Sequence, residues 1–351
     1  MLTGPSRWLA ALLLALAGCV PQVQGLGTPQ APARLAADRF VAADGKALPL
    51  QVWPAQGAPR AVIVALHGFN MYRRYFDAPA PWWAARGITT YAYDQRGFGA
   101  GPDSGIWPGT PALVADARAV VRLARRRHPG VPIYLLGDSM GAAVAMLAAS
   151  GEGAPQLDGL ILVAPAVWGG EAMSPLTRIS LWLAAHLMPW NVATGGSLRR
   201  MPTDNIEFLR ALGRDPLVIK RTRIDAIYGV TRLMGAAFAV APRVPGPLLV
   251  LYGERDEIVP SDPVYEAVAA MTATRRFAVY PNGWHMLLHD LQAETVWQDV
   301  VAWIADPDAP LPSGAAAAEG KGPGREAAIA AGPAPATTAG RPAPAGRQPH
   351  G

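Results

Sequence analysis

The sequence predicts an α/β protein with a mostly parallel central sheet flanked by helices. Short, unbroken runs of Val, Ile and Leu recur between about residues 38 and 306, and segments with helical periodicity separate them. Unbroken apolar runs are typical of strands buried on both faces, and strands joined by helices pair in parallel. Of the 351 residues, 51% are hydrophobic, which allows a sizeable core, although length alone leaves open one large domain or two ordinary ones.

The expected elements follow one another in a regular order. Residues 39–53 read as a hairpin that turns at Asp44-Gly45, a common two-residue turn signal. Residues 110–127 have apolar side chains at helical spacing, and the stop signal Pro129-Gly130 follows them. A further helix is expected over 141–150. Buried strands are expected within 61–68, 87–99, 132–139, 157–167, 246–256 and 275–285.

Residues 170–243 interrupt this alternation. The stretch is poor in strand patterns, rich in Trp, Met, Leu and Arg, and stands between two expected strands of the sheet. We interpret it as a helical cap inserted over the carboxyl edge of the sheet. Because the elements on either side continue the same pattern, the folded part is predicted to extend from 38 to 306.

A serine lies between two glycines where an expected strand meets an expected helix. Gly137-Asp138-Ser139-Met140-Gly141 fits the pattern G-x-S-x-G, and a strand before it and a helix after it are the context of a nucleophile elbow. Such a turn exposes the serine hydroxyl, and side chains at 137 and 141 would collide with nearby backbone. Ser139 is therefore the candidate nucleophile. The alternative is a serine that caps a helix in a glycine-rich turn.

A serine hydroxyl is a weak nucleophile near neutral pH, and it needs a base that a carboxylate orients. The elbow predicts the chain order serine, acid, histidine. Asp256 follows one expected strand, and His285 follows the next through a Pro-Asn-Gly turn. Glu254 and Glu257 stand close to Asp256 and remain alternatives for the acid. Two other histidines are poorer candidates for the base: His289 and His350.

Two backbone N–H groups must hold the charge that develops on the carbonyl oxygen during acyl transfer. One is expected from Met140, directly after the serine. The other is expected from the loop after the first buried strand, where His67-Gly68-Phe69 supplies the amide of Phe69. His67 precedes the serine in the chain, so we expect it to shape this loop rather than to act as the base.

Taken in chain order, these motifs resemble those of the α/β-hydrolase superfamily. The monoacylglycerol lipase-like and lysophospholipase-like serine hydrolases, the serine aminopeptidase-type group, have motifs similar to HGFN, YDQRGFGAG, GDSMG, GERDEIVP and GWHMLLHD. The resemblance covers about residues 38–305 and implies the α/β-hydrolase fold. Asp138 departs from the pattern, because many relatives carry histidine or glutamate there, and we expect its side chain to point away from the serine. The resemblance also implies an architectural role for one loop: Asp94, Arg96, Gly97 and Gly99.

The resemblance further implies ester hydrolysis in two steps. Ser139 would attack an ester carbonyl with His285 as the base, and water would then hydrolyse the acyl-enzyme. Monoglycerides or lysophospholipids are the expected lipid-like substrates, provided that the apolar cap segments 179–190 and 226–238 line an acyl channel rather than only pack. The alternatives are an esterase or thioesterase for small acyl substrates, and a non-catalytic envelope protein that binds ligands on the same fold.

Composition and spacing give no sign of a cofactor, a metal or a nucleic-acid partner. The formal net charge is +5, from 31 basic and 26 acidic residues. The densest basic run, 122–128, is typical of a solvated helix end. No cluster of metal ligands is recognisable, and the GFGAG stretch runs into Pro102 instead of opening a helix, unlike a dinucleotide-binding loop. The oligomeric state stays open.

The amino terminus predicts a lipid anchor. Residues 1–18 combine Arg7, an apolar stretch and small residues, and this stretch is shorter than the about 20 residues that span a bilayer. The only cysteine of the chain, Cys19, follows in LAGC, which resembles a bacterial lipobox. We therefore expect a lipoprotein signal peptide over 1–18, lipidation of Cys19 and a flexible tether over 19–37. The alternative is a chance cysteine near an ordinary cleavage site.

The residue after the cysteine, Val20, predicts the location. A residue other than aspartate there resembles the sorting pattern for the outer membrane of Gram-negative bacteria. The expected location is the bacterial cell envelope, with the protein lipid-anchored to the outer membrane and facing the periplasm. At the other end, residues 312–351 are rich in Ala, Pro and Gly, and they predict a disordered tail because they bury too little apolar surface.

Overall fold

The computed structural model describes residues 20–194 and 200–315. Two predictions lie outside these residues, namely the signal peptide over 1–18 and the lipidation of Cys19. The larger part of the predicted tail, 316–351, and with it His350, also lies outside them.

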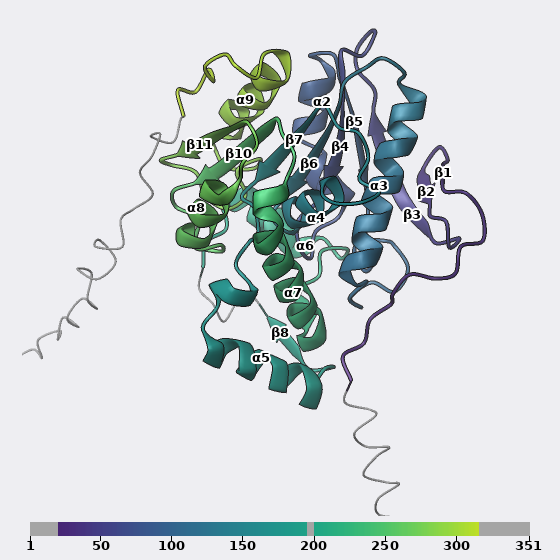
Figure 1. The fold of residues 1–351 in the computed structure, drawn as a ribbon, viewed down its shortest axis with the longest axis vertical. Helices are drawn as coiled ribbons and strands as arrows, with labels where there is room; N and C mark the ends of the chain where they lie inside the picture. The colour runs from purple at the N-terminus through teal and green to yellow at the C-terminus, as the bar shows by residue number, and fades with distance from the viewer. Residues whose placement is uncertain (1–19, 195–199, 316–351) are drawn as a thin grey trace, which may run out of the picture. The chain divides into compact units, whose positions relative to one another are not determined.

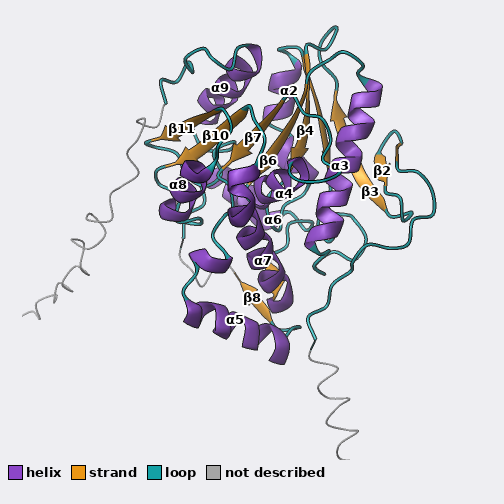
Figure 2. Cartoon of the chain, viewed as in Figure 1, coloured by secondary structure: helices purple, strands orange, loops and turns teal. Residues whose placement is uncertain are grey.

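The described residues form a sheet of nine strands in the order β1-β2-β3-β5-β4-β6-β7-β10-β11 (Figures 1 and 2). The pairs from β1 to β5 are antiparallel, which includes the predicted hairpin of β2 and β3, and every pair from β5 onward is parallel. The mostly parallel sheet is confirmed. The strands are β1 (Arg34–Leu35), β2 (Arg39–Val41), β3 (Ala47–Trp53), β4 (Ala61–Leu66), β5 (Ile88–Tyr93), β6 (Ile133–Asp138), β7 (Gly159–Val163), β10 (Leu248–Gly253) and β11 (Arg275–Tyr280).

Helices cover both faces of the sheet (Figure 2). Side chains alternate between the two faces along a strand, so Val62 and Val64 of β4 enter one core while Ile63 and Ala65 enter the other. The helices α3, α4, α7 and α8 close the first core, and α2 and α9 close the second. Their bounds are α2 (Pro79–Ala84), α3 (Thr110–Arg127), α4 (Met140–Ala149), α7 (Ile224–Val240), α8 (Ser261–Ala270) and α9 (Ala293–Ala305).

The cap is inserted between β7 and β10, as predicted. Its helices are α5 (Pro175–Leu187) and α6 (Ile206–Arg214). It differs from a purely helical cap because β8 (Val192–Thr194) and β9 (Arg221–Arg223) form an antiparallel pair.

The predicted end of the cap at residue 243 is too late. The helix α7 packs against α4 and buries Leu233 and Ala237 in the first core, so it belongs to the helical layer of the sheet. Within the described residues, only α7 with the turn after it, Ile224–Arg243, is long and apolar enough to cross a membrane. Its packing against α4 explains this composition, since core helices are apolar for the same reason.

The prediction of a flexible tether is wrong for its described part, residues 20–37. The Gln22 N–H donates to Oδ2 of Asp225 at the start of α7 (3.1 Å), and Val23 forms a β-bridge with Trp107. Further along, β1 joins the edge of the sheet. Asp225 lies 203 positions from Gln22, and Trp107 lies 84 positions from Val23, so these contacts leave no periodic pattern in the segment itself.

The first described residues of the predicted tail, 312–315, contact the folded domain. The Ser313 N–H donates to Oδ1 of Asp299 on α9 (3.0 Å), and Leu311 just before it is buried. The composition of the tail therefore does not predict the structure of its first residues, because Ser313 hydrogen-bonds to the buried carboxylate of Asp299 on the last helix.

A buried ionic cluster fixes the loop after β5. Arg96 is 1% exposed and makes two hydrogen bonds to the carboxylate of Asp116 on α3 and two to that of Asp44 in the hairpin turn. Such bidentate pairs fix geometry as well as charge. A Cβ on Gly99, where φ is 59°, would lie 2.4 Å from Oδ2 of Asp94. The loop thus joins the hairpin, α3 and the sheet, in keeping with the architectural role expected of it.

Candidate active site

A tight turn carries the chain from β6 into α4 at Ser139. Its φ of 52° and ψ of −113° are unusual for a residue with a side chain, and such strain costs of order 1–3 kcal/mol. A Cβ on Gly137 would lie 2.3 Å from the carbonyl oxygen of Gly141, and a Cβ on Gly141 would lie 2.1 Å from that of Leu66. Both positions therefore require glycine, as the sequence predicts.

Three side chains from distant parts of the chain meet at the carboxyl edge of the sheet. The Nε2 atom of His285 lies 2.9 Å from Oγ of Ser139, and its Nδ1 atom lies 2.7 Å from Oδ2 of Asp256. The other carboxylate oxygen of Asp256 accepts the N–H groups of Ile258 and Val259 (2.8 and 2.9 Å). A hydroxyl, an imidazole and a carboxylate thus stand in series, which lets the imidazole take the hydroxyl proton while the carboxylate fixes its tautomer.

The two other acids near Asp256 do not contact the histidine. Glu254 and Glu257 are both exposed. Oε2 of Glu257 instead accepts the N–H of Met201, a cap residue, at 2.7 Å. The structure therefore brings Asp256, and neither glutamate, to His285.

The surroundings of His285 favour its charged form. Burial lowers the pKa of this 5% exposed imidazole, but the carboxylate of Asp256 outweighs that effect, and Asp138 and Asp290 add to it. The net result is a pKa of His285 raised above its usual 6.5. An imidazolium formed during the reaction is stabilised by the same charges.

The loop expected to supply an oxyanion donor lies beside the serine. A Cβ on Gly68 would lie 3.4 Å from Cβ of Ser139. The ring of Phe69 packs edge-on against Phe98, with 5.7 Å between centroids, which holds the loop in place. Among the described residues, the N–H groups of Phe69 and Met140 donate to no acceptor. An oxyanion hole consists of two free donors of this kind, next to the nucleophile.

His67 has the loop-shaping position expected of it. Its Nε2 atom accepts the N–H of Gln95 (3.0 Å), so its Nδ1–H donates to the carbonyl oxygen of Gly68 (2.9 Å). Complete burial lowers the pKa of His67 to about 4, so the ring is neutral at physiological pH. Both ring nitrogens are engaged with backbone, and neither is available as a base.

Asp138 lies closer to the reacting groups of the site than expected. Its carboxyl group is buried against the oxyanion loop, where a Cβ on Gly68 would lie 3.1 Å from its Oδ2 atom. The hydroxyl of Tyr75 donates to its Oδ1 atom (3.1 Å). Burial is the main reason that the pKa of Asp138 is raised to about 7; His285 and the hydrogen bond from Tyr75 lower it, and Asp256 and Asp290 add to the rise, within that net value. Asp138 is therefore largely protonated below neutral pH.

Replacing Asp138 with asparagine should move the acid limb of the kcat/KM profile to lower pH. This limb reports the loss of the proton from His285, whose neutral form is the base. The ionised Asp138 carboxylate raises the pKa of His285, and asparagine cannot ionise. We expect a downward shift of roughly one pH unit, measured with a soluble ester between pH 5 and 9.

The stability of the same variant provides an independent check. The folded protein holds a proton on Asp138 up to about pH 7, whereas the unfolded chain loses it near pH 4, so this group reduces stability as pH rises between those values. The Tm of Asp138→Asn minus that of the wild type should therefore increase from pH 4 to pH 8. A difference independent of pH, together with an unshifted acid limb, would contradict this account of Asp138.

A cap segment is hydrogen-bonded to the loop that carries His285, a contact that the sequence analysis does not predict. The Met286 N–H donates to the carbonyl oxygen of Pro202 (2.8 Å). The ring of Phe208 on α6 stacks on His289 with 3.9 Å between centroids, and the Nε2 atom of His289 lies 2.7 Å from the carbonyl oxygen of Tyr75. His289 is thus a buried packing residue, in agreement with its lower rank as a base.

Asp290 supports the histidine loop directly. Its Oδ2 atom accepts the N–H of Trp284, the residue before His285, at 2.7 Å. The acidic residue five positions after the histidine in WHMLLHD was the available signal for this contact. Within the described residues no group of three or more His, Cys, Asp or Glu side chains is arranged to hold a metal ion.

Comparison with known proteins assigns the family. The model of the family described as "Serine aminopeptidase, S33" matches residues 57–292, which is more than half of the chain. The chain belongs to this family. The matched range includes Ser139, Asp256 and His285.

Relatives and solved structures agree with this assignment. A monoacylglycerol lipase from Mycolicibacterium smegmatis is 27% identical over 281 residues, which cover 76% of this chain and 95% of that protein. A soluble variant of monoglyceride lipase from Saccharomyces cerevisiae superimposes with a TM-score of 0.66 at 19% identity, over 81% of this chain and 97% of that chain. A thermostable carboxyl esterase from Bacillus coagulans superimposes with a TM-score of 0.63 at 19% identity, over 80% and 99%. The α/β-hydrolase fold is confirmed, and this S33-family member is a serine hydrolase that acts on esters.

Proposed function

We propose that this enzyme hydrolyses esters of single-chain lipids, either monoglycerides or lysophospholipids, through an acyl-enzyme on Ser139. The observation that carries the chemistry is the hydrogen-bonded series Asp256–His285–Ser139. The family and the relatives support ester hydrolysis, and the lipid-like substrate and the covalent intermediate are the parts that we propose.

The reaction follows from the positions of these groups. Nε2 of His285 takes the proton of Ser139 as Oγ attacks the ester carbonyl, and the amides of Phe69 and Met140 hold the oxyanion. His285 then protonates the leaving alcohol, and the acyl group stays on Ser139. Water attacks this acyl-enzyme with His285 again as the base, which releases the fatty acid and restores the hydroxyl.

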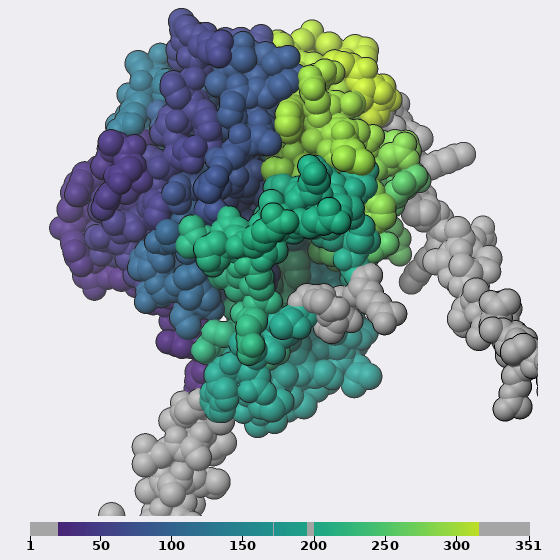
Figure 3. Space-filling view, turned by 180° about the vertical axis from the view of Figure 1, so that it is seen from behind, coloured from purple at the N-terminus to yellow at the C-terminus, as the bar shows by residue number. Residues whose placement is uncertain are grey.

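The substrate class rests on the cap and on the relatives. The apolar residues Ile179, Trp182 and Leu183 of α5 are between 43% and 57% exposed, which is unusual for side chains of this size unless something apolar covers them. Figure 3 shows the cap segments, in teal and green, gathered on one side of the domain. The relative from Mycolicibacterium smegmatis bears the name monoacylglycerol lipase, in line with a single-chain lipid ester.

A panel of esters tests the substrate class. The wild-type enzyme should hydrolyse 1-monoacylglycerols or lysophosphatidylcholines of eight or more carbons with higher kcat/KM than acetyl or butyryl esters, with and without detergent. A preference for short esters or for thioesters would favour the small-substrate alternative. Hydrolysis no faster than that of Ser139→Ala on every ester would favour a non-catalytic binding protein.

We further propose that the protein is a lipoprotein of the bacterial cell envelope, anchored through Cys19 to the outer membrane and facing the periplasm. The carboxylate of Asp225 binds the N–H of Gln22, and the N–H of Asp225 donates to the carbonyl oxygen of Pro189 (3.2 Å). The segment that leads from Cys19 therefore runs beside the end of α5. There the cap exposes several large apolar side chains: Leu183, Leu187, Met188 and Trp190.

Replacing Cys19 with serine should transfer the protein from the membrane fraction to the soluble fraction. The physical reason is that acyl chains on the cysteine supply most of the membrane affinity, since each buried CH₂ contributes about 0.8 kcal/mol. Fractionation of cells that produce each form, followed by immunoblotting, measures this. Membrane retention at the wild-type level would rule out an anchor at Cys19.

A further inference from the structure

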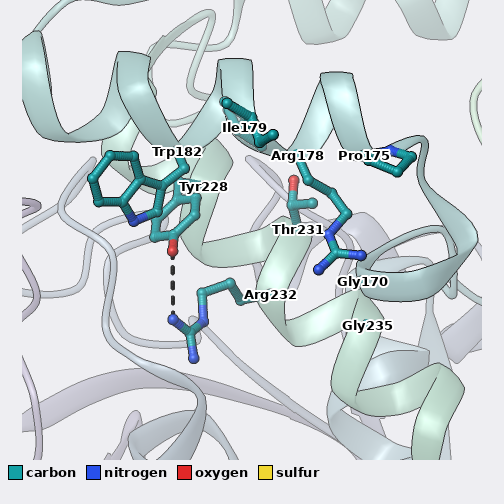
Figure 4. A pocket seen from close by; sticks show the side chains of 10 residues that line it. Gly170, Pro175, Arg178, Ile179, Trp182, Tyr228, Thr231, Arg232 and Gly235 are labelled. Carbon is teal, nitrogen blue, oxygen red and sulfur yellow. Dashed lines mark hydrogen bonds between the residues drawn. The ribbon is translucent and has the colours of Figure 1, made fainter.

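A pocket with a volume of about 600 Å³ lies between α5 of the cap and α7 (Figure 4). Its walls are of two kinds. Ile179 and Trp182 of α5 form an apolar wall, whereas Arg178 of α5 and Arg232 of α7 bring two guanidinium groups to it from opposite helices. Pockets of this size can hold a ligand with tens of atoms.

We propose that this pocket binds a single-chain amphiphile with an anionic head, with its hydrocarbon chain on the apolar wall and its head between the two arginines. This is a second ligand site, because neither the three residues of the serine–histidine–aspartate series nor Phe69 or Met140 line the pocket. Its apolar wall belongs to the same exposed face of α5 that supports the proposed substrate class, so the proposal rests on the proposed function for that observation and adds the two arginines.

The charge of the pocket favours an anion. Among the described residues neither Arg178 nor Arg232 forms an ion pair, and no carboxylate lines the pocket. Within the described part of the chain, the guanidinium of Arg232 interacts with the hydroxyl of Tyr228 (3.4 Å) and with the face of its ring. Guanidinium groups remain charged at any physiological pH and match the geometry of carboxylate and phosphate oxygens. Two such groups, with no carboxylate among the described residues that line the pocket, favour an anionic ligand.

One neutral group adds a donor to the head site. Thr231 also lines the pocket, but its hydroxyl already donates to the carbonyl oxygen of Ile227 (2.8 Å) and supplies no proton to an anion. The hydroxyl of Tyr228 accepts from Arg232 and keeps its own proton free to donate to an anion. The head site therefore has donors from both helices.

The apolar wall calls for a hydrocarbon chain. Ile179 is 57% exposed and Trp182 is 48% exposed, so their surfaces gain from being covered. They belong to the same face of α5 as Leu183 and Leu187, which are also exposed. A hydrocarbon chain that enters from a lipid phase along this face lies on the apolar wall, and the anionic head of the same molecule lies beside the two arginines.

One loop joins the pocket to the nucleophile. The N–H of Ala166 donates to the carbonyl oxygen of Ser139 (3.2 Å), and three residues later the backbone packs against α7, where a Cβ on Gly169 would lie 2.3 Å from the carbonyl oxygen of Thr231.

Two kinds of amphiphile have the required chemistry, namely a fatty acid and a lipid with a single chain and a phosphate head.

Binding to the full chain carrying Ser139→Ala tests the site, because that variant cannot consume an ester. Isothermal titration with decanoate, decyl phosphate and 1-monodecanoylglycerol, each below its micelle concentration, distinguishes the two anionic heads from a neutral one. We expect decanoate, decyl phosphate or both to bind at least about tenfold more tightly than the glyceride, and this preference to weaken with added salt.

Arginine variants locate the binding. Arg178→Gln with Arg232→Gln should weaken binding of the anion by at least about tenfold and leave binding of the glyceride unchanged. Arg210→Gln, an exposed arginine on α6 of the same cap, is the matched control and should have no effect. Circular dichroism and the thermal transition show whether each variant is folded. Anion affinity that does not fall with added salt, or that is unchanged in the folded double variant, would overturn the proposal.

Discussion

Replacing Ser139 with alanine is expected to lower kcat for ester hydrolysis by about 10⁴- to 10⁶-fold. The hydroxyl is the only atom that forms the covalent bond to the acyl group, and the alanine variant keeps the oxyanion donors but has no nucleophile. The rate is measured with p-nitrophenyl butyrate and with a long-chain monoglyceride. Folding should be preserved, because alanine removes one half-buried oxygen from a turn whose path is set by Gly137 and Gly141.

Three further variants make this result specific. His285→Ala should lose a similar factor, and the double variant should lose no more than either single one, because the residues act as a unit. Ser104→Ala removes an exposed serine in the loop after β5 and should retain the wild-type rate. Hydrolysis by Ser139→Ala within tenfold of the wild type would mean that another residue attacks the ester.

Replacing Asp256 with asparagine should lower kcat by about 10³- to 10⁴-fold. The carboxylate binds Nδ1 of His285 at 2.7 Å and raises the pKa of the imidazole above its usual value. Asparagine has nearly the same shape but no charge, and its amide can favour the tautomer with the wrong nitrogen protonated. Both the base and the imidazolium formed after proton transfer are then poorly supported. Steady-state kinetics across pH 5 to 9 measures the loss.

The neighbouring glutamates are natural controls for this variant. Glu254→Gln and Glu257→Gln should each retain most of the activity, because both side chains are exposed and away from His285. The glutamine at 257 can still accept the N–H of Met201. A near-normal rate for Asp256→Asn, combined with a large loss in either glutamine variant, would transfer the orienting role to that glutamate.

The part of the site that could be predicted depends on local rules. Ser139 was predictable because the turn into α4 needs glycine on both sides, and the backbone contacts at Gly137 and Gly141 show why. Asp256 and His285 were predictable in position because each follows a parallel strand, and parallel strands end at one edge of the sheet. The sequence does not distinguish Asp256 from Glu254 and Glu257 as the acid, because the three residues differ in the direction of their side chains, which only the folded structure shows.

The remainder depends on contacts between residues far apart in the chain. The amide of Gln22 meets Asp225 across 203 positions, so nothing in the composition of the first segment distinguishes it from a flexible tether. The stacking of Phe208 on His289 joins the cap to the histidine loop in the same way. Asp138 was expected to point away from the site, but its charge raises the pKa of His285, and its own pKa is raised by burial that the pattern of one strand does not reveal.

Covalent labelling by a fluorophosphonate, followed by mass spectrometry of proteolytic peptides, tests the central claim most directly. The account predicts a single phosphonyl adduct per chain, located on Ser139, which is absent in Ser139→Ala and forms far more slowly in His285→Ala. An adduct on a different residue, or equally fast labelling of Ser139 without His285, would contradict it.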